Sequence, residues 1–166
     1  MEIKLPPGGN LEQIKRIEAV AITLMAKHGL RPGQAGGWSF KWGNAAKVGG
    51  TCSYKTRTLR FSAPLFSLWT TAQAVDLIKH EIAHALAGEG HHHDEIWWKI
   101  ARDIGATGSR CWGKLGEKSI PPTWKGTCPK GHVRYAYRKP KQARCCGICS
   151  PHVFDARYIR KWEPNQ

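Results

Sequence analysis

The segment His80-Glu81-Ile82-Ala83-His84 constrains this chain more than any other part of its sequence. It lies within residues 71–88, where apolar residues recur at helical spacing. Side chains four residues apart lie on nearly the same face of a helix, so the two histidines can bind one ion together. We therefore expect a fold in which this helix presents both imidazoles at one accessible site.

Two histidines and a carboxylate at this spacing suit a catalytic zinc ion. Zinc binds neutral imidazole and lowers the pKa of a bound water molecule to about 7. Glu81 is angled away from direct ligation, and it can take a proton from that water and pass it to a leaving amine. The motif thus predicts peptide hydrolysis by zinc-activated water with Glu81 as general base. Asp76, one turn before His80, either orients the ring of His80 or is an ordinary solvent-facing acid.

A catalytic zinc also needs a third protein ligand and an open position. Three consecutive histidines, residues 91–93, follow the end of the predicted helix. We favour His93 because it directly precedes the next predicted helix, where Trp97 can pack behind it. His91 remains the alternative.

The surrounding sequence predicts an α+β catalytic domain over residues 1–106. Amphipathic patterns indicate three helices, at residues 11–28, 71–88 and 94–104. Thr70 and Gln73 resemble a capping box before the second of them. Residues 38–62 alternate like β-strands, with a turn at residues 55–57.

Closely spaced cysteines near the C-terminus predict a second metal site. Residues 107–125 are rich in Gly and Pro and are expected to be a linker, followed by a module at residues 126–166. A tetrahedral structural zinc site is predicted there, with the ligands Cys128, His132, Cys146 and Cys149. Cys145 is then spare, although it can replace Cys146. The protein is thus expected to bind one catalytic and one structural Zn²⁺.

The positive charge is concentrated in the same part of the chain. The formal net charge is +14, and residues 107–166 hold 13 Lys and Arg against three acids, a net of +10. Basic side chains interleaved with aromatic ones suit single-stranded DNA, because cations contact phosphates and rings stack on bases. The predicted contacts are Arg134, Tyr135, Tyr137, Arg138, Lys139, Lys141 and Arg144. Alternatively, the two tyrosines form the module's own small core.

Taken together, these residues resemble the SprT-like family, which includes the Spartan proteases. The resemblance runs from about Leu11 to Trp162 and is carried by residues 76–86, by residues 93–97 and by the cysteine clusters. It implies a zincin-like minimal metalloprotease domain, with an N-terminal helix, a small antiparallel sheet, the HExxH helix and a following helix, plus a C-terminal zinc ribbon. It further implies zinc ligation by His80, His84 and His93, catalysis by Glu81, and substrates that are proteins bound or crosslinked to DNA.

The small size of the chain is similar to that of bacterial or phage members of the family. Two departures concern the ribbon: His132 stands where four cysteines are more usual, and Cys145 makes the second half-site ambiguous.

The sequence also fits two other functions. One alternative is a zinc-containing DNA-binding protein without protease activity, whose first zinc is structural and closed by His91 or Cys111. Another is a peptidase whose basic tail binds an acidic protein. No stretch is apolar enough to span a membrane and no signal peptide is recognised, so we expect a cytoplasmic protein of a bacterium or a phage-infected host, with no membrane partner.

Overall fold

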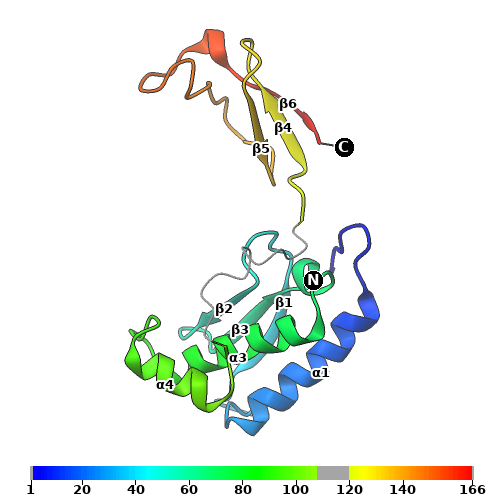
Figure 1. Cartoon of the computed structure of the whole chain (residues 1–166), viewed down its shortest axis with the longest axis vertical. Coiled ribbons are helices and arrows are strands. Elements are labelled where there is room, and N and C mark those ends of the chain that lie inside the picture. The colour runs from blue at the N-terminus through cyan, green and yellow to red at the C-terminus, as the bar shows by residue number, and fades with distance from the viewer. Residues whose placement is uncertain (1, 108–119, 166) are drawn as a thin grey trace. The chain divides into compact units, whose positions relative to one another are not determined.

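The computed structural model describes residues 2–107 and 120–165, and the chain divides into two compact units, residues 1–120 and 121–166 (Figure 1). Most of the expected linker, residues 107–125, lies outside the described residues, and so does Cys111. The first strand of the second unit begins at Trp124, inside the segment expected to be linker. No described helix combines the length and the apolar character that crossing a membrane requires.

The first unit is an α+β arrangement of four helices and three strands among its described residues. They are α1 (Leu11–Lys27), β1 (Ser39–Gly43), β2 (Gly50–Ser53), β3 (Thr58–Ser62), α2 (Ala63–Phe66), α3 (Thr71–Ala87) and α4 (Glu95–Asp103). The three predicted helices are confirmed within one residue at each end, and the short α2 was not predicted. Thr70 and Gln73 form the predicted capping box at the start of α3.

The three strands form one sheet in the order β1-β3-β2. The predicted hairpin is present, since β2 and β3 are antiparallel and pair Cys52 with Leu59. The expectation of an antiparallel sheet was wrong for β1, which runs parallel to β3 and pairs Trp42 with Phe61. Residues 44–49 link β1 to β2 without pairing the two strands, so β3 lies between them. Alternation in a sequence gives the face of a side chain but not the direction of the neighbouring strand.

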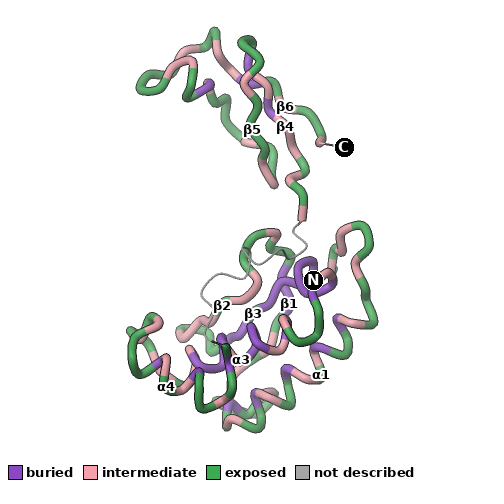
Figure 2. The backbone as a smooth tube through the Cα atoms, viewed as in Figure 1, coloured by how far each residue is buried: buried purple, intermediate pink, exposed green. Residues whose placement is uncertain are grey.

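The core of the first unit lies between the sheet and helices α1 and α3. Ile14 and Ile17 of α1, Ile78 of α3 and Phe61 of β3 are all at most 1% exposed. The buried residues follow the inner faces of these elements in Figure 2. This packing fixes α3 against the sheet, with contacts to both α1 and β2, and the histidine motif therefore lies on a rigid element.

The second unit is built on one small three-stranded antiparallel sheet, and its described cysteines are free thiols. Its elements are β4 (Trp124–Thr127), β5 (Val133–Ala136), the 3₁₀ turn η1 (Ala156–Tyr158) and β6 (Lys161–Pro164). The strand order is β5-β4-β6, and both pairings are antiparallel. Gly126 of β4 lies against the indole of Trp162, where a Cβ atom would come within 2.7 Å of the ring. The buried side chains include Cys128 and Cys146 but few aliphatic residues, as expected for a small unit stabilised by a metal ion.

Candidate metal centres

Three imidazoles converge in the first unit. The Nε2 atom of His93 lies 3.0 Å from Nε2 of His80 and 3.1 Å from Nε2 of His84. His80 and His84 project from successive turns of α3, and His93 approaches from the segment before α4. The structure thus brings together the three side chains that sequence analysis selected as ligands of a catalytic zinc ion.

The environment keeps the imidazoles of His80 and His84 neutral at physiological pH. Burial, together with the neighbouring His84 and His93, lowers the pKa of His80 to about 3. Burial and the neighbouring His93 lower the pKa of His84 to about 4, although a hydrogen bond to the backbone of His91 acts in the opposite direction. A neutral imidazole offers a free lone pair, which is the form that binds a metal ion.

The spacing of the donor atoms also fits a tetrahedral ion. Three nitrogen ligands at about 2.0–2.1 Å from zinc, at tetrahedral angles, lie about 3.3 Å from one another. The observed separations of 3.0 and 3.1 Å are close to that value. In the described part of the chain, no fourth Cys, His, Asp or Glu side chain joins this cluster. The residues present therefore fit a zinc ion held by three protein ligands.

The position of His93 depends on its backbone and on Trp97. His93 has φ 59°, in the left-handed region that few non-glycine residues occupy. Asp94 follows as the N-cap of α4 and accepts a hydrogen bond from the backbone N–H of Trp97. The Trp97 side chain is fully buried, and its ring centroid lies 4.5 Å from that of His93 and 4.7 Å from that of His80. Trp97 thus packs behind the cluster, as predicted.

The other two histidines of the triplet lie outside the cluster. The Nδ1 atom of His91 is 2.6 Å from a carboxylate oxygen of Asp94, so this ring is engaged elsewhere. His92 is exposed. The structure therefore favours His93 over the alternative His91.

Asp76 has a role that neither interpretation of the sequence anticipated. Its carboxylate is buried, and it accepts hydrogen bonds from the backbone N–H and the hydroxyl of Thr107. The Nδ1 atom of His80 is buried and has no partner among the described residues. Asp76 is thus neither a solvent-facing acid nor the acceptor for His80, and it instead fixes the segment after α4 against α3.

Glu81 is buried between α3 and the outer strand β2. It is 6% exposed, and a Cβ atom at Gly50 would lie 2.8 Å from one of its carboxylate oxygens. Burial raises the pKa of Glu81 to about 8. Burial, and then the nearby Glu81, raise the pKa of the Cys52 thiol to about 12. A glycine at position 50 thus leaves room for a carboxylate that binds protons more tightly than usual.

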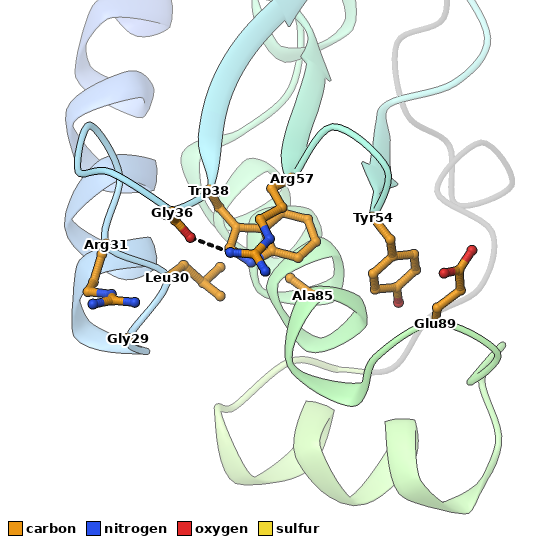
Figure 3. Close-up of a pocket in the computed structure, with 10 residues that line it drawn as sticks. Gly29, Leu30, Arg31, Gly36, Trp38, Tyr54, Arg57, Ala85 and Glu89 are labelled. Atoms are coloured by element: carbon orange, nitrogen blue, oxygen red, sulfur yellow. Dashed lines mark hydrogen bonds between the residues drawn. The ribbon is translucent and has the colours of Figure 1, made fainter.

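A cavity of about 440 Å³ lies beyond the end of β2, next to the C-terminal part of α3 (Figure 3). Its walls include Trp38, Tyr54, Arg57 and Glu89. The Tyr54 hydroxyl donates a 2.6 Å hydrogen bond to the carbonyl of His84. The lining residues do not include His80, His84 or His93, so the cavity is separate from the histidine cluster.

The second unit brings together a cluster of three cysteines and one histidine: Cys128, His132, Cys146 and Cys149. The Nδ1 atom of His132 lies 3.2, 3.6 and 3.7 Å from the three sulfur atoms, and the sulfurs of Cys128 and Cys149 are 3.9 Å apart. Ligands of a tetrahedral zinc ion lie about 3.5 Å apart for N and S and about 3.8 Å apart for two sulfurs. The donor set therefore fits zinc.

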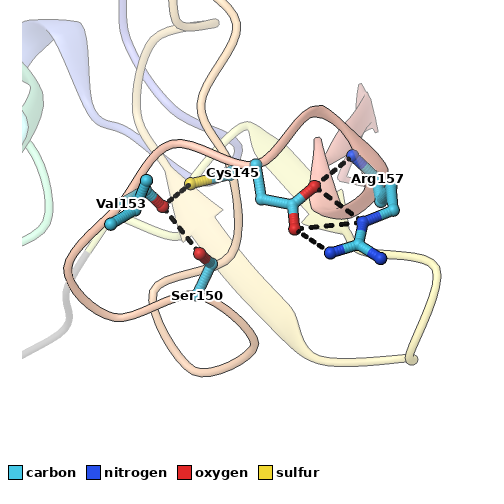
Figure 4. Close-up of polar contacts among 5 residues, drawn as sticks. Cys145, Ser150, Val153 and Arg157 are labelled. Carbon is cyan, nitrogen blue, oxygen red and sulfur yellow. Dashed lines mark hydrogen bonds and ion pairs between the residues drawn. The ribbon is translucent and has the colours of Figure 1, made fainter.

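Cys145 is excluded from that cluster by the direction of its side chain. Its sulfur is directed to the carbonyl oxygen of Val153 at 3.8 Å, which Figure 4 shows together with the hydrogen bond from Ser150 to the same oxygen. Cys146, by contrast, is fully buried at the cluster. The structure thus distinguishes two neighbouring cysteines that the sequence left ambiguous.

The residues predicted to contact nucleic acid are divided between two faces of the second sheet. Directly paired residues of neighbouring strands project to the same face. Tyr135 pairs with Lys125, whereas Arg134 pairs with Gly126, which in turn pairs with Trp162. Tyr135 and Arg134 therefore project to opposite faces. Four further predicted residues are exposed outside the strands: Arg138, Lys139, Lys141 and Arg144.

Tyr135 does not belong to a core. Its side chain is 54% exposed, so the alternative that it packs inside the module is wrong for this residue. Tyr137 is half-buried. The ammonium group of Lys139 lies 5.2 Å from the ring centroid of Trp124, an aromatic residue that the sequence-based set did not include. The sequence could not predict this contact from the spacing of Trp124 and Lys139, because the pairing of β5 with β4 brings the two residues together.

Comparison with known families identifies one match. The model described as the SprT-like family matches residues 21–126, which include the histidine cluster and Glu81 and cover more than half of the chain. The ribbon cysteines lie beyond the matched range. No curated protein and no solved structure matches this chain.

Proposed function

The chain belongs to the SprT-like family, and we propose that it is a zinc-dependent peptidase that acts on DNA-associated or DNA-crosslinked proteins. The family is in general one of metallopeptidases. The single observation that carries the proposal is the convergence of the three Nε2 atoms of His80, His84 and His93, two of which lie on the same helix as the buried Glu81. We further propose that the first unit is a zincin-like minimal domain.

In this proposal the three imidazoles hold a catalytic Zn²⁺. When bound, zinc supplies Lewis acidity, which polarises the scissile carbonyl and lowers the pKa of water to about 7. Glu81 acts as general base: its carboxylate accepts the proton of the attacking water and then donates it to the nitrogen of the leaving amine. Burial raises the pKa of this carboxyl to about 8 without a metal ion, and the positive charge of a bound Zn²⁺ would lower it towards neutral pH, where a general base works best.

The position of β2 supports a peptide as the substrate. It is one of the two outer strands of its sheet among the described residues, and it packs along α3 at Gly50, where Glu81 lies. The unpaired backbone groups of an outer strand can bind an extended peptide through main-chain hydrogen bonds. A peptide held in this way passes next to the carboxylate whatever its side chains are, which suits an enzyme with diverse protein substrates.

The second unit is proposed as a zinc ribbon that binds single-stranded DNA, with a structural Zn²⁺ held by Cys128, His132, Cys146 and Cys149. The net charge of +10 over residues 107–166 and the exposed Tyr135 support this role. DNA then acts by co-localisation, because enzyme and protein substrate on one strand meet at a higher effective concentration.

The deciding experiment measures cleavage of a DNA-binding protein by the zinc-loaded chain, with and without single-stranded DNA. Wild type should cleave, and DNA should increase the rate. Glu81→Gln should abolish cleavage but retain the metal at the histidine cluster. Glu12→Gln, which removes an exposed carboxylate of α1, is the matched control and should cleave like wild type.

Two outcomes contradict the proposal. Cleavage by Glu81→Gln at the wild-type rate excludes Glu81 as the general base. No cleavage by wild type of any protein substrate, combined with intact binding of zinc and DNA, favours the alternative of a zinc-containing DNA-binding protein without protease activity.

A further inference from the structure

A buried arginine contacts the ribbon cluster. Arg160 lies between η1 and β6 and is 8% exposed. One terminal nitrogen, Nη2, donates to the sulfur of Cys146 at 3.2 Å, and the other, Nη1, donates to the carbonyl oxygen of Cys145 at 2.7 Å. A single guanidinium thus binds both the side chain of a candidate ligand and the backbone immediately before it.

The backbone of the same segment holds the cysteines in register. The N–H of Arg160 donates to the carbonyl of Arg144, and the N–H of Cys146 donates to the carbonyl of Tyr158. Cys145 and Ile159 form an isolated antiparallel bridge between these two bonds. The guanidinium therefore reaches the cluster from a backbone that is already fixed against it, so little side-chain freedom is lost in making the contact.

The charge of Arg160 has no carboxylate partner. Among the described residues, no Asp or Glu forms an ion pair with it. A buried arginine is rare without a compensating negative charge, because removing the charged guanidinium from water is unfavourable. The negative charge available at this position is that of the cysteine sulfurs.

The charges of the cluster and of Arg160 sum to zero when the cluster holds a divalent ion. Three thiolates and one neutral imidazole around Zn²⁺ carry a net charge of −1, and Arg160 brings the total to zero. Arg157, three residues earlier, shows the contrasting case: its side chain is 80% exposed and pairs with Asp155 at 2.8 Å (Figure 4).

We propose that Arg160 is a positioning residue of the ribbon metal site, which neutralises the excess negative charge of the Cys₃His donor set and orients Cys146 through an N–H···S hydrogen bond. The inference rests on the proposed ribbon zinc site but not on peptidase activity. Partners that hydrogen-bond to metal ligands orient those ligands, and their loss weakens metal binding by roughly 10- to 100-fold.

The test titrates the metal-free full-length chain with Co²⁺ and then with Zn²⁺ in competition with a chelator. The thiolate-to-cobalt charge-transfer absorption reports the ribbon alone, because the histidine cluster contains no cysteine. The variants are Arg160→Lys, which retains the charge, Arg160→Gln, which retains a donor, and Arg160→Met, which retains only the volume. Arg157→Met makes the same change of charge at the exposed neighbour and is the matched control.

We expect the affinity for the metal ion to fall in the order wild type, Arg160→Lys, then Arg160→Gln and Arg160→Met, with Arg160→Met weakened roughly 10- to 100-fold. The charge-transfer band of Arg160→Met should shift to lower energy because Cys146 loses its hydrogen bond, and Arg157→Met should match wild type in both measurements. A role in packing alone predicts the opposite order, with Arg160→Met best tolerated and Arg160→Lys worst. That order, or equal affinities for all variants, overturns the proposal. Failure of the wild type to show a thiolate band overturns the ribbon site itself and with it this inference.

Discussion

The Nε2 atoms of His80 and His93 lie 3.0 Å apart, although the two residues are 13 positions apart in the chain. Gly88 and Gly90, both at positive φ, allow the chain to turn after α3. Asp94 then caps α4, and Trp97 on its first turns packs against both imidazoles. The third imidazole is therefore placed by the start of a helix and not by a free loop.

His93→Ala should weaken zinc binding at the histidine cluster far more than His92→Ala. Loss of a hydrogen-bond partner to a ligand typically costs 10- to 100-fold, so loss of a ligand should cost at least about 100-fold. His92 is exposed and has the same neighbours in sequence, which makes it the matched control. Competition with a chelator measures both affinities. A stronger effect of His92→Ala would show that His93 is not the third ligand.

The stability of the metal-free protein should depend on pH through Glu81. Its pKa is about 8 in the folded state and 4.5 without perturbation, so the folded state binds its proton more tightly. Stability from this group is then fully present below about pH 4.5 and is lost as the pH rises through 8, by at most ~5 kcal/mol. Glu81→Gln should remove this loss. Hydrogen exchange of the α3 amides at several pH values measures it.

His80 and His84 should lower the stability of the metal-free protein at acid pH. Burial lowers the pKa values of His80 and His84 in the folded state, so their contribution is present above about 6.5 and is lost as the pH falls towards 4 and below. Glu81→Gln should leave this acid limb unchanged, and Glu12→Gln should leave both limbs unchanged. Stability of metal-free Glu81→Gln that still falls as the pH rises from 5 to 8 would assign the alkaline limb to another group.

Cys146→Ser and Cys145→Ser should differ although the residues are adjacent. Cys146 is buried at the cluster, whereas the sulfur of Cys145 is directed to the carbonyl of Val153. Elemental analysis should find two zinc ions per chain for wild type and Cys145→Ser, and one for Cys146→Ser combined with Cys149→Ser. If wild type contains only one zinc ion and the double variant retains it, the ribbon is not a zinc site.

Single-stranded DNA should bind through the exposed part of the second unit. Replacing Arg138, Lys139 and Lys141 with Glu should weaken binding and reduce its dependence on salt, because fewer counterions are released. Tyr135→Ala should weaken binding by roughly 1–3 kcal/mol if a base stacks on this ring. Fluorescence anisotropy at several salt concentrations measures both effects.

The matched control for that charge reversal places three glutamates in the first unit, at Arg16, Lys41 and Lys55. All three are exposed, so the total change of charge is the same. Equal weakening by the two triple variants would indicate a response to overall charge and not a DNA site on the ribbon.

The sequence by itself determined the features that depend on neighbours in the chain. The spacing of His80 and His84, the capping box at Thr70 and the hairpin between β2 and β3 are local, since each depends on residues a few positions apart. The same holds for the two half-sites of the ribbon. Helical and strand periodicity report such local geometry directly, and these elements were predicted correctly.

Only the tertiary structure decided which distant residues meet. Gly50 against Glu81, Thr107 bound to Asp76, β1 parallel to β3, and Arg160 bound to Cys146 each join residues whose separation carries no period. Tyr135 and Arg134 were grouped by sequence but separated by the pleat of a strand. The physical reason is that burial and strand pairing are properties of the packed chain, because they depend on which surfaces exclude water together and not on the order of residues.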